Sequence, residues 1–386
     1  MEEVAYSFLP KQIMKCIYEK RKSLDPDMKY YARIEKVEDG AYVEVWFLTK
    51  GCRWDAEGGC TICNYGKGCE TKNEVMIESI QKAIHGVDAK MGELAITPSG
   101  SFLDDEEVPP EVRKQIYQIV NQSDAHTFLF ETRAQTITEE KIKELTESVK
   151  GKKLVVEIGL ETADFFIQKY CINKGYFLKE YEKAVAVLKK YHVCTYANVI
   201  LGTPYLNYEE ALKDCKRTID WAIAHGTDKV VLFPLHVKPG TMIEWLYKNG
   251  LYKPIPLWGL VDVLDSLNEE QLSRIEISWY KNYYTDKSKI IASPGTCDNC
   301  YDDVILLLDE FRENPKREVI RKINQYSCAC REGWNSIEKK SGSLVERLKE
   351  QYAMMAKDLL GEDVWNANSE KFCMELEKDY EKYHEK

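Results

Sequence analysis

The chain has 386 residues with 54 basic and 64 acidic side chains, so its formal net charge is −10. An apolar share of 44% and a charged share of 31% exclude an intrinsically disordered chain. No run of about 18 apolar residues predicts a membrane helix, and the first residues, MEEVAYSFLP, lack the features of a signal peptide. We therefore expect a cytoplasmic protein of two or three domains, or of one large α/β domain with extensions. The acidic balance argues against nonspecific binding of nucleic acid, which depends on a basic surface.

Short β-branched or aromatic runs alternate with longer amphipathic runs from residue 42 to residue 249. The predicted strands are 42–48, 94–97, 127–131, 154–158, 195–201 and 229–235. The predicted helices are 75–89, 110–122, 138–150, 178–191, 208–225 and 241–249. Thr138 is predicted to cap its helix, because Glu139 and Glu140 follow it in the first turn. Strands that alternate with helices predict an α/β fold with a parallel sheet, which either opens or curls toward a barrel.

The rest of the chain has a different pattern. Segment 254–284 is apolar and aromatic, with one helix predicted over 257–272, and a cysteine-rich region follows at 293–334. From residue 333 onward the pattern is helical and charged. We therefore predict an N-terminal helical extension (1–41), an α/β array (42–290), and a cysteine-rich segment followed by C-terminal helices (291–386).

The chain has 13 cysteines, and an odd number in a reducing cytosol does not indicate a disulfide framework. A first cluster follows the first predicted strand, in TKGCRWDAEGGCTICNYG (49–66), where Cys52, Cys60 and Cys63 have the spacing CX7CX2C. Iron–sulfur clusters are held by cysteine thiolates, normally four. Three thiolates would leave one iron of a [4Fe–4S] cluster open to another ligand, as a catalytic zinc ion keeps an open position. A zinc loop and three unrelated thiols are the alternatives.

At these residues the sequence resembles the radical S-adenosylmethionine (SAM) superfamily. The resemblance implies a partial (β/α)6 barrel, similar to a TIM barrel, with the cluster loop after its first strand. It also implies that SAM chelates the open iron through its amino and carboxylate groups. Reductive cleavage of SAM then gives a 5′-deoxyadenosyl radical that abstracts hydrogen from the substrate, with an electron donor such as flavodoxin or ferredoxin. The commonest spacing in the superfamily is CX3CX2C, so the first gap here belongs to a longer variant.

The ends of later strands extend the resemblance, since ligands of a parallel barrel bind at the carboxyl ends of its strands. The SGS turn after strand two resembles the turn that binds the SAM amino group, where GGE is usual. Glu161 after strand four resembles a SAM contact, and Lys174 in INKG resembles the basic residue for the SAM carboxylate. Strand five is similar to the strand that meets the ribose and adenine. The resemblance thus implies cofactor contacts at Tyr65, Ser99, Gly100, Ser101, Arg133, Glu161, Lys174, Asn198 and Ile200.

A narrower resemblance is to the radical SAM subunit of archaeosine synthase and its relatives, which include the Elongator catalytic subunit. The matching stretches are 49–66, SGSFLDDEEVP (99–109), IGLET (158–162), INKG (172–175) and 238–264. It implies radical cleavage of a lysine adduct on 7-deazaguanine in tRNA, leaving a formamidine. The turn LGTPYL after strand five departs from the family pattern, and no appended RNA-binding domain is apparent. A radical SAM enzyme for a small metabolite or peptide is therefore the alternative. A non-catalytic structural metal protein is the alternative of another class.

A second cysteine cluster consists of Cys297 and Cys300, then Cys328 and Cys330 after 27 intervening residues. The pattern CX2C…CXC suits a zinc ion held by four thiolates or a second [4Fe–4S] cluster without an open iron. We favour zinc, which would fasten the C-terminal segment to the barrel.

Two further residues follow strand six at the ligand end of the predicted barrel. His236 and Lys238 are candidates to contact a carboxylate or phosphate of the substrate, and His236 is also a candidate proton relay. Packing within the loop is the alternative for both residues. The predicted partners are SAM, the electron donor, and a modified tRNA or a small molecule, with no membrane.

Overall fold

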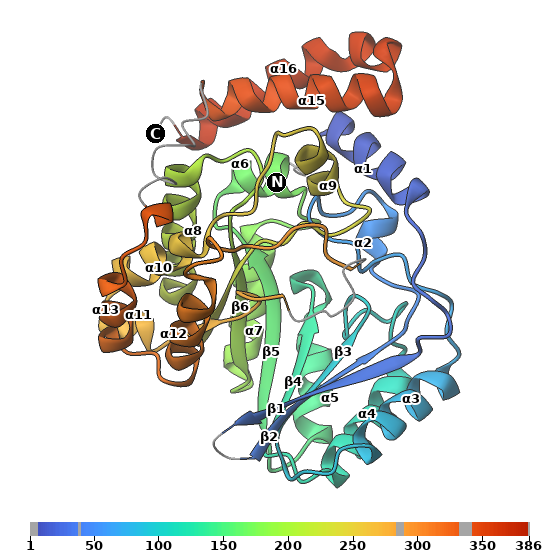
Figure 1. The fold of residues 1–386 in the computed structure, drawn as a ribbon. Helices are drawn as coiled ribbons and strands as arrows, with labels where there is room; N and C mark the ends of the chain where they lie inside the picture. Colours follow the sequence, from blue (N-terminus) through green and yellow to red (C-terminus); the bar gives the residue numbers. More distant parts are fainter. Residues whose placement is uncertain (1–6, 38–39, 283–288, 332–341, 385–386) are drawn as a thin grey trace.

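The computed structural model describes residues 7–37, 40–282, 289–331 and 342–384. Its centre is an eight-stranded sheet in which the spatial order of the strands follows the chain (Figure 1). The strands are β1 (Tyr30–Val37), β2 (Gly40–Phe47), β3 (Met91–Pro98), β4 (Thr127–Thr132), β5 (Lys153–Glu161), β6 (Cys194–Leu201), β7 (Lys229–Pro234) and β8 (Ile275–Ile277). Strands β2 to β8 are parallel, and β1 pairs antiparallel with β2. The predicted α/β class and curled parallel sheet are confirmed.

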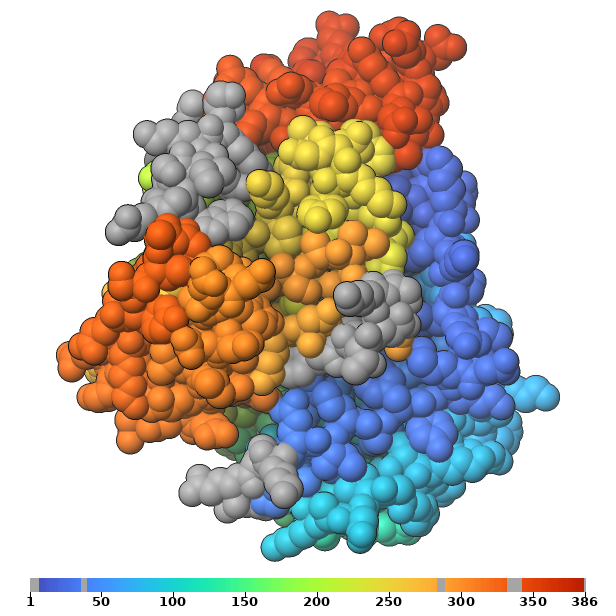
Figure 2. Space-filling model, viewed as in Figure 1, coloured from blue at the N-terminus to red at the C-terminus, as the bar shows by residue number. Residues whose placement is uncertain are grey.

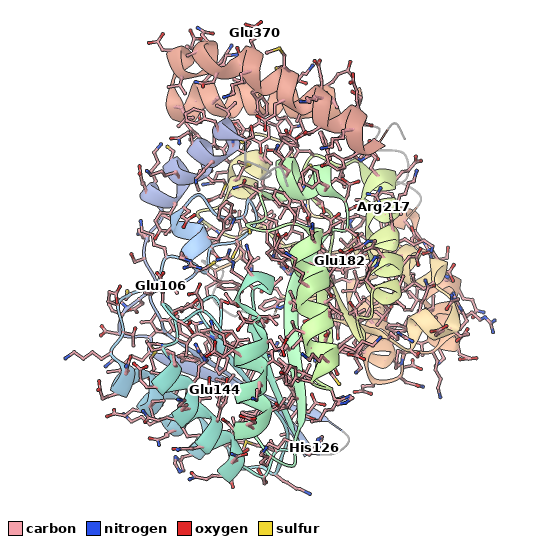
Figure 3. All side chains as sticks on the ribbon, turned by 180° about the vertical axis from the view of Figure 1, so that it is seen from behind. Glu106, His126, Glu144, Glu182, Arg217 and Glu370 are labelled. Atoms are coloured by element: carbon pink, nitrogen blue, oxygen red, sulfur yellow. The ribbon has the colours of Figure 1, made fainter. Side chains whose placement is uncertain are left out.

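Helices connect the parallel strands, as the alternating pattern predicted. The helices are α1 (Phe8–Lys20), α2 (Arg53–Ala56), α3 (Asn73–His85), α4 (Pro110–Gln122), η1 (Ala134–Thr136), α5 (Glu139–Ser148), α6 (Phe165–Ile167), η2 (Gln168–Ile172), α7 (Leu178–Lys190), α8 (Tyr208–Ala224), α9 (Met242–Lys248), α10 (Leu257–Ser266), α11 (Glu269–Leu272), α12 (Tyr301–Glu313), α13 (Arg317–Gln325), α15 (Leu344–Leu360) and α16 (Glu362–His384). Seen from behind, Glu144 of α5 and Glu182 of α7 mark helices on the outer side of the sheet (Figure 3). None of the helices in the described ranges has the length and apolar character to cross a membrane.

Local side-chain chemistry explains where the helices begin. Thr138 accepts a hydrogen bond from the backbone N–H of Lys141, which confirms the predicted N-cap of α5. The prediction of one helix over 257–272 was wrong. The chain is extended at Leu267, and Asn268 with Gln271 forms a capping box that begins α11 separately from α10.

The sequence analysis missed both outer strands of the sheet. Residues 1–41 were predicted to be helical, but they contain β1 as well as α1. The β1–β2 register places Tyr31 opposite Trp46 and Arg33 opposite Glu44. β8 has only three residues, too few to show a strand pattern. β1 and β8 stand at opposite ends of the strand order, so the curled sheet is open between them.

The concave interior of the sheet is apolar at one end and polar at the other. Ala95, Leu129, Val155, Tyr196 and Val231, one from each of β3 to β7, form a small buried apolar cluster. Side chains two positions further along a strand lie on the same face. These are Thr97, Glu131, Glu157, Asn198 and Phe233, toward the carboxyl ends of the strands. The apolar cluster thus closes the bottom of the barrel and leaves polar groups at the end where the ligands of parallel barrels bind.

The last two helices, α15 and α16, pack on each other and against α1 and α6 at one end of the molecule (Figures 1 and 2). Lys169 of η2 lies 2.8 Å from both Glu375 and Asp379 of α16. The Tyr352 hydroxyl donates to the carbonyl of Tyr170 at 2.8 Å. The C-terminal helices therefore fix the position of η2.

Candidate active site

The loop that carries the first cysteine cluster follows β2 and is held by the chain just after η2. The Trp54 indole N–H donates to the carbonyl of Asn173 at 2.9 Å, and the Asn173 side-chain amide donates to the carbonyl of Gly59 at 2.7 Å. The backbone N–H of Thr61 donates to the carbonyl of Ile172 at 2.9 Å. Part of the INKG stretch therefore has a structural role, because it clamps the cysteine loop from the far side of the barrel.

The three cysteines of this loop lie close enough to influence one another electrostatically. Burial raises the pKa of the Cys52 thiol to about 11 and that of Cys60 to about 12, and the Cys63 sulfur contributes to both shifts. Buried neutral thiols must lose their protons to bind a metal, so metal binding releases protons here. Among the described residues, the four sulfurs of the second cluster all lie within 4.8 Å of one another. Cys52, Cys60 and Cys63 do not form a group of this kind.

The residues between Cys52 and Cys60 include α2, which is held in place by the end of the N-terminal helix α1. Asp55 in α2 makes a buried ion pair with Arg21 at the end of α1, with side chains 3% and 5% exposed. The Arg21 Nε also donates to the carbonyl of Gly240, after β7, at 2.7 Å. Arg21 thus joins three segments at the mouth of the barrel. These contacts could not be predicted from the sequence, because the partners are 34 and 219 positions apart.

The SGS turn after β3 is joined to the cysteine loop through Glu107. The Thr49 hydroxyl donates to one carboxylate oxygen of Glu107 at 2.6 Å, and the backbone N–H of Ser101 donates to the other at 2.6 Å. Ser99 Oγ accepts from the backbone N–H of Thr49 at 3.1 Å. A Cβ atom at Gly100 would lie 2.8 Å from the Cys52 Cα, so glycine permits the close approach of the two segments. Glu107, which the sequence analysis did not select, therefore sets the distance between the turn and the cysteine loop.

Beside this loop, Glu161 and Lys174 form an ion pair that uses only one of the two carboxylate oxygens of Glu161. Lys174 Nζ lies 2.8 Å from Glu161 Oε1, and the two side chains are 11% and 12% exposed. Glu161 has a φ of 66°, a left-handed conformation that is unfavourable for a residue other than glycine. Its Oε2 atom is buried and has no hydrogen-bond partner in the structure. A residue with a strained backbone and a buried oxygen that lacks a hydrogen-bond partner indicates that a ligand binds there.

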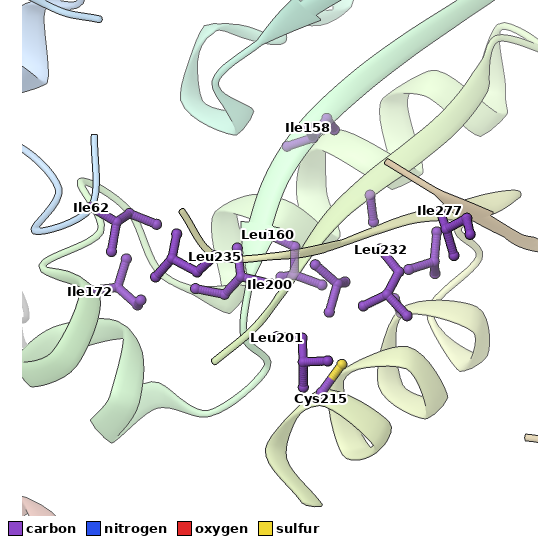
Figure 4. Packing of buried hydrophobic residues seen from close by; sticks show 14 of the residues in the cluster. Ile62, Ile158, Leu160, Ile172, Ile200, Leu201, Cys215, Leu232, Leu235 and Ile277 are labelled. Carbon is purple, nitrogen blue, oxygen red and sulfur yellow. The ribbon is translucent and has the colours of Figure 1, made fainter. Parts of the chain in front are cut away.

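The other predicted cofactor residues lie around the same end of the barrel. Arg133 follows β4 and lies near Cys52, whose pKa it lowers against the effect of burial. Asn198 of β6 donates to Glu157 of β5. Ile200 is 1% exposed and packs in the large apolar cluster with its neighbours, where Ile62 of the cysteine loop also lies (Figure 4). Its contact with an adenine ring stays a prediction, as do the other individual cofactor contacts.

The two predicted substrate residues differ in their surroundings. His236 is 3% exposed, and burial lowers its pKa to about 4, so the ring is neutral. Its Nε2 donates to the carbonyl of Trp279 at 2.6 Å, and its Nδ1 lies 3.1 Å from the Ser293 hydroxyl. Both ring nitrogens thus have protein partners, and the geometry supports a packing role. Lys238 instead lies at the site, with Nζ 2.9 Å from the Tyr65 hydroxyl and 4.1 Å from the centre of its ring.

The second cysteine cluster brings four sulfurs close together, with Cys300 buried and the other three cysteines partly exposed. The sulfur of Cys297 lies 3.6 Å from Cys300 and 3.4 Å from Cys328, and Cys300 lies 3.6 Å from Cys330. The indole N–H of Trp258, from α10, donates to the Cys330 sulfur at 3.2 Å. The four thiols therefore converge on one point with a hydrogen-bond donor beside them, which is the arrangement of a metal site.

Known proteins match both the chain and the cysteine loop. Residues 46–218 match the family model for the radical SAM superfamily. Over 301 residues the chain is 30% identical to archaeosine synthase subunit beta of Methanosarcina acetivorans, which covers 76% of this chain and 84% of that protein. The chain belongs to the radical SAM superfamily. It is also 28% identical over 246 residues to archaeosine synthase subunit beta of Thermococcus kodakarensis, covering 61% of this chain and 76% of that protein. An Elp3 structure from Methanocaldococcus infernus with an N-terminal deletion aligns with a TM-score of 0.44 and 17% identity, over 62% of this chain and 58% of that one.

A radical SAM enzyme implies a [4Fe–4S] cluster and SAM, and the residues present fit both groups. Cys52, Cys60 and Cys63 would supply three thiolates, one fewer than such a cluster normally has, and would thereby leave a position for SAM. The unpartnered Glu161 Oε2, with Lys174 beside it, offers an acceptor and a cation to the polar groups of SAM. When bound, the cluster supplies the electron that cleaves SAM. The protein's part is to hold both groups in place and exclude water.

Glu107 makes the stability of this radical SAM enzyme depend on pH. Burial raises the pKa of this carboxyl from 4.5 to about 7, so the folded chain binds its proton more tightly than the unfolded chain does. Its contribution to stability is full below pH 4.5 and is lost as the pH rises through 7, up to about 3 kcal/mol. We expect Glu107→Gln to reduce the fall in the free energy of unfolding between pH 5 and pH 8, measured by anaerobic urea unfolding. Glu106→Gln, at an exposed neighbour, is the control and should follow the native protein. Equal pH slopes for native protein and Glu107→Gln would contradict this role.

Proposed function

We propose that this radical SAM enzyme acts on a 7-deazaguanine nucleoside in tRNA, and that it cleaves a lysine adduct as archaeosine synthase does. The observation that carries the proposal is the 30% identity to archaeosine synthase subunit beta, because the match extends over 84% of that protein. The proposal includes SAM and an electron donor such as flavodoxin or ferredoxin. The alternative is a radical SAM enzyme for a small metabolite or peptide, which the superfamily match alone supports equally.

The concave interior of the barrel supports a polar substrate beside the SAM site. Burial, together with neighbouring carboxylates, raises the pKa of both Glu131 and Glu157. The Glu131 side chain still reaches solvent, because it faces the space inside the barrel. Glu161 and Lys238 both contribute to the shift in the pKa of Glu131, so this carboxyl lies near both of them. A substrate in this space would meet carboxyl groups that readily accept hydrogen bonds or a positive charge.

The test is the formation of 5′-deoxyadenosine by the anaerobic enzyme with SAM and dithionite. We expect tRNA that carries the lysine-linked 7-deazaguanine to raise the rate at least about tenfold, because a bound substrate positions the bond that reacts. The same tRNA without the lysine is the control and should give the basal rate. A rate that does not respond to the modified tRNA would contradict the proposal and favour the small-molecule alternative. No product from protein with a full cluster would contradict the cleavage of SAM itself.

For the second cysteine cluster we propose a single zinc ion. A zinc–sulfur bond of about 2.3 Å gives a tetrahedron with edges of about 3.8 Å, close to the separations of 3.4 and 3.6 Å between these sulfurs. The thiolates of a [4Fe–4S] cluster lie farther apart, because each projects outward from a different corner of the cluster. Zinc would join the loop before α12 to the segment after α13.

A further inference from the structure

A cavity of about 260 Å³ lies on the open side of the barrel. Tyr31 and Arg33 of β1, Glu44 of β2 and Trp279 just after β8 line it. In the antiparallel register Tyr31 is opposite Trp46 and Arg33 is opposite Glu44, so the β1 side chains share the face of Glu44. This volume is just below the range of about 300 to 1,000 Å³ typical of small-molecule sites. It is therefore suited to one ring system rather than to a whole nucleotide.

The walls of the cavity combine aromatic rings with a charged pair. The Arg33 guanidinium lies 2.7 Å from Glu44, and the two side chains are 26% and 17% exposed. Glu35, which also approaches Arg33, pairs with Arg312 at 2.6 Å outside the cavity lining. A carboxylate has about four acceptor positions, so Glu44 can accept from a ligand while it keeps its bond to Arg33. Tyr31 is held in place by stacking on Trp46, with ring centres 5.5 Å apart.

Trp279 connects this cavity to the cysteine loop. Its φ of 52° is left-handed, and the hydrogen bond from His236 to its carbonyl holds that conformation. Lys238 Nζ lies 5.7 Å from the Trp279 ring and 4.1 Å from the ring of Tyr65, two residues after Cys63. A ligand against Trp279 is therefore separated from the SAM side by little more than the Lys238 and Tyr65 side chains.

We propose that this cavity binds the guanine-type ring of the substrate, with the Watson–Crick edge of the ring against Arg33 and Glu44. Glu44 accepts from the ring N–H and the exocyclic amine, and Arg33 donates to the ring carbonyl. Tyr31 and Trp279 contact the ring through their aromatic faces, as in enzymes that read a base taken out of its stack. An adenine-type ring presents an acceptor where guanine has its ring N–H, so Glu44 rejects it. This inference rests on the proposed function, which supplies the 7-deazaguanine class.

Equilibrium dialysis of the anaerobic holoenzyme with free 7-deazaguanine and 7-deazaadenine tests the inference. We expect the native enzyme to prefer 7-deazaguanine at least about tenfold, and Glu44→Gln to lose about tenfold in affinity, because one bidentate pair supplies this discrimination. Glu35→Gln removes a carboxylate that also approaches Arg33 but lies outside the cavity lining, and it should bind as the native enzyme does. Trp279→Leu is a second variant, for the case in which Glu44→Gln does not fold, and should lose the stacking contribution. Equal binding of the two bases, or unchanged affinity in folded Glu44→Gln and Trp279→Leu, would overturn the inference.

The result separates this inference from the proposed function. Preference for 7-deazaguanine without stimulation of SAM cleavage by modified tRNA would leave the cavity assignment standing and remove the tRNA reaction. Stimulation by modified tRNA that Glu44→Gln leaves unchanged, with no preference between the two bases, would keep the reaction and place the ring elsewhere.

Discussion

Replacement of Cys52, Cys60 and Cys63 together by alanine is expected to remove the iron of the first site and reduce 5′-deoxyadenosine formation to background. Thiolates are the usual ligands of such a cluster, and the triple variant removes all three that the loop is expected to supply. Iron per chain, visible absorption and product formation measure the effect. We expect about four irons per chain in the native protein and none in the triple variant.

Cys69 provides a matched control for this experiment. It lies in the same loop, but its thiol donates to the carbonyl of Leu24 at 3.3 Å and takes no part in the group formed by the other three cysteines. Cys69→Ala should therefore keep its iron and its activity. Unchanged iron in the triple variant would refute the assignment of the first site. Loss of iron in Cys69→Ala would add a ligand that the structure does not assign.

The parts of this site that were predictable share a strong local signal. The spacing of Cys52, Cys60 and Cys63 after a β-branched run indicates both the ligand chemistry and the place of the loop in a βα array. Glu161 was also predictable, because it follows a strand at the end where ligands bind. Its left-handed backbone, at a register shift in the pairing of β5 with β6, and its buried acceptor were not, since both depend on tertiary structure.

The missed residues act through contacts between distant segments. In the sequence, Asp55 is one charged residue among others in a polar loop. Only the structure shows that it pairs with Arg21, at the end of α1. Glu107 lies in the acidic run DDEE, and only the structure separates it, at 2% exposure, from its exposed neighbour Glu106. In Figure 3, Glu106 marks the side of the molecule where α2 and its Arg53 lie, and Arg53 pairs with it at 3.0 Å. Burial thus decides which acid of a run has a role, and burial depends on tertiary packing.

The cavity was hidden from the sequence for the same reason. β1 was not predicted, so Tyr31 and Arg33 had no assigned face, and Trp279 was one residue of the apolar and aromatic segment 254–284. His236 was predicted to bind the substrate because of its place after a strand. One of its hydrogen bonds holds the carbonyl of Trp279 and the other reaches the Ser293 hydroxyl, which favours the packing alternative, while a contact with the substrate stays a prediction.

Loss of the second metal site is expected to have the largest effect on stability. Cys300 is 1% exposed and lies within 3.6 Å of two other cysteine sulfurs, so Cys300→Ala removes a central ligand. Binding of structural zinc contributes on the order of 10 kcal/mol to the folding of the segment that holds it. We therefore expect Cys300→Ala to lose its zinc. The segment that contains α12 and α13 should then become sensitive to protease while the barrel stays folded.

Elemental analysis of four proteins decides the identity of the metal. We expect the native protein to contain one zinc and about four irons per chain, since a cubane cluster needs four irons and a tetrathiolate site one zinc. The triple variant of the first site should keep its zinc and lose its iron, and Cys300→Ala should do the reverse. Cys373→Ala, which changes a cysteine of α16 outside both clusters, is the control and should keep both metals. About eight irons without zinc in the native protein would refute the zinc assignment and indicate a second iron–sulfur cluster.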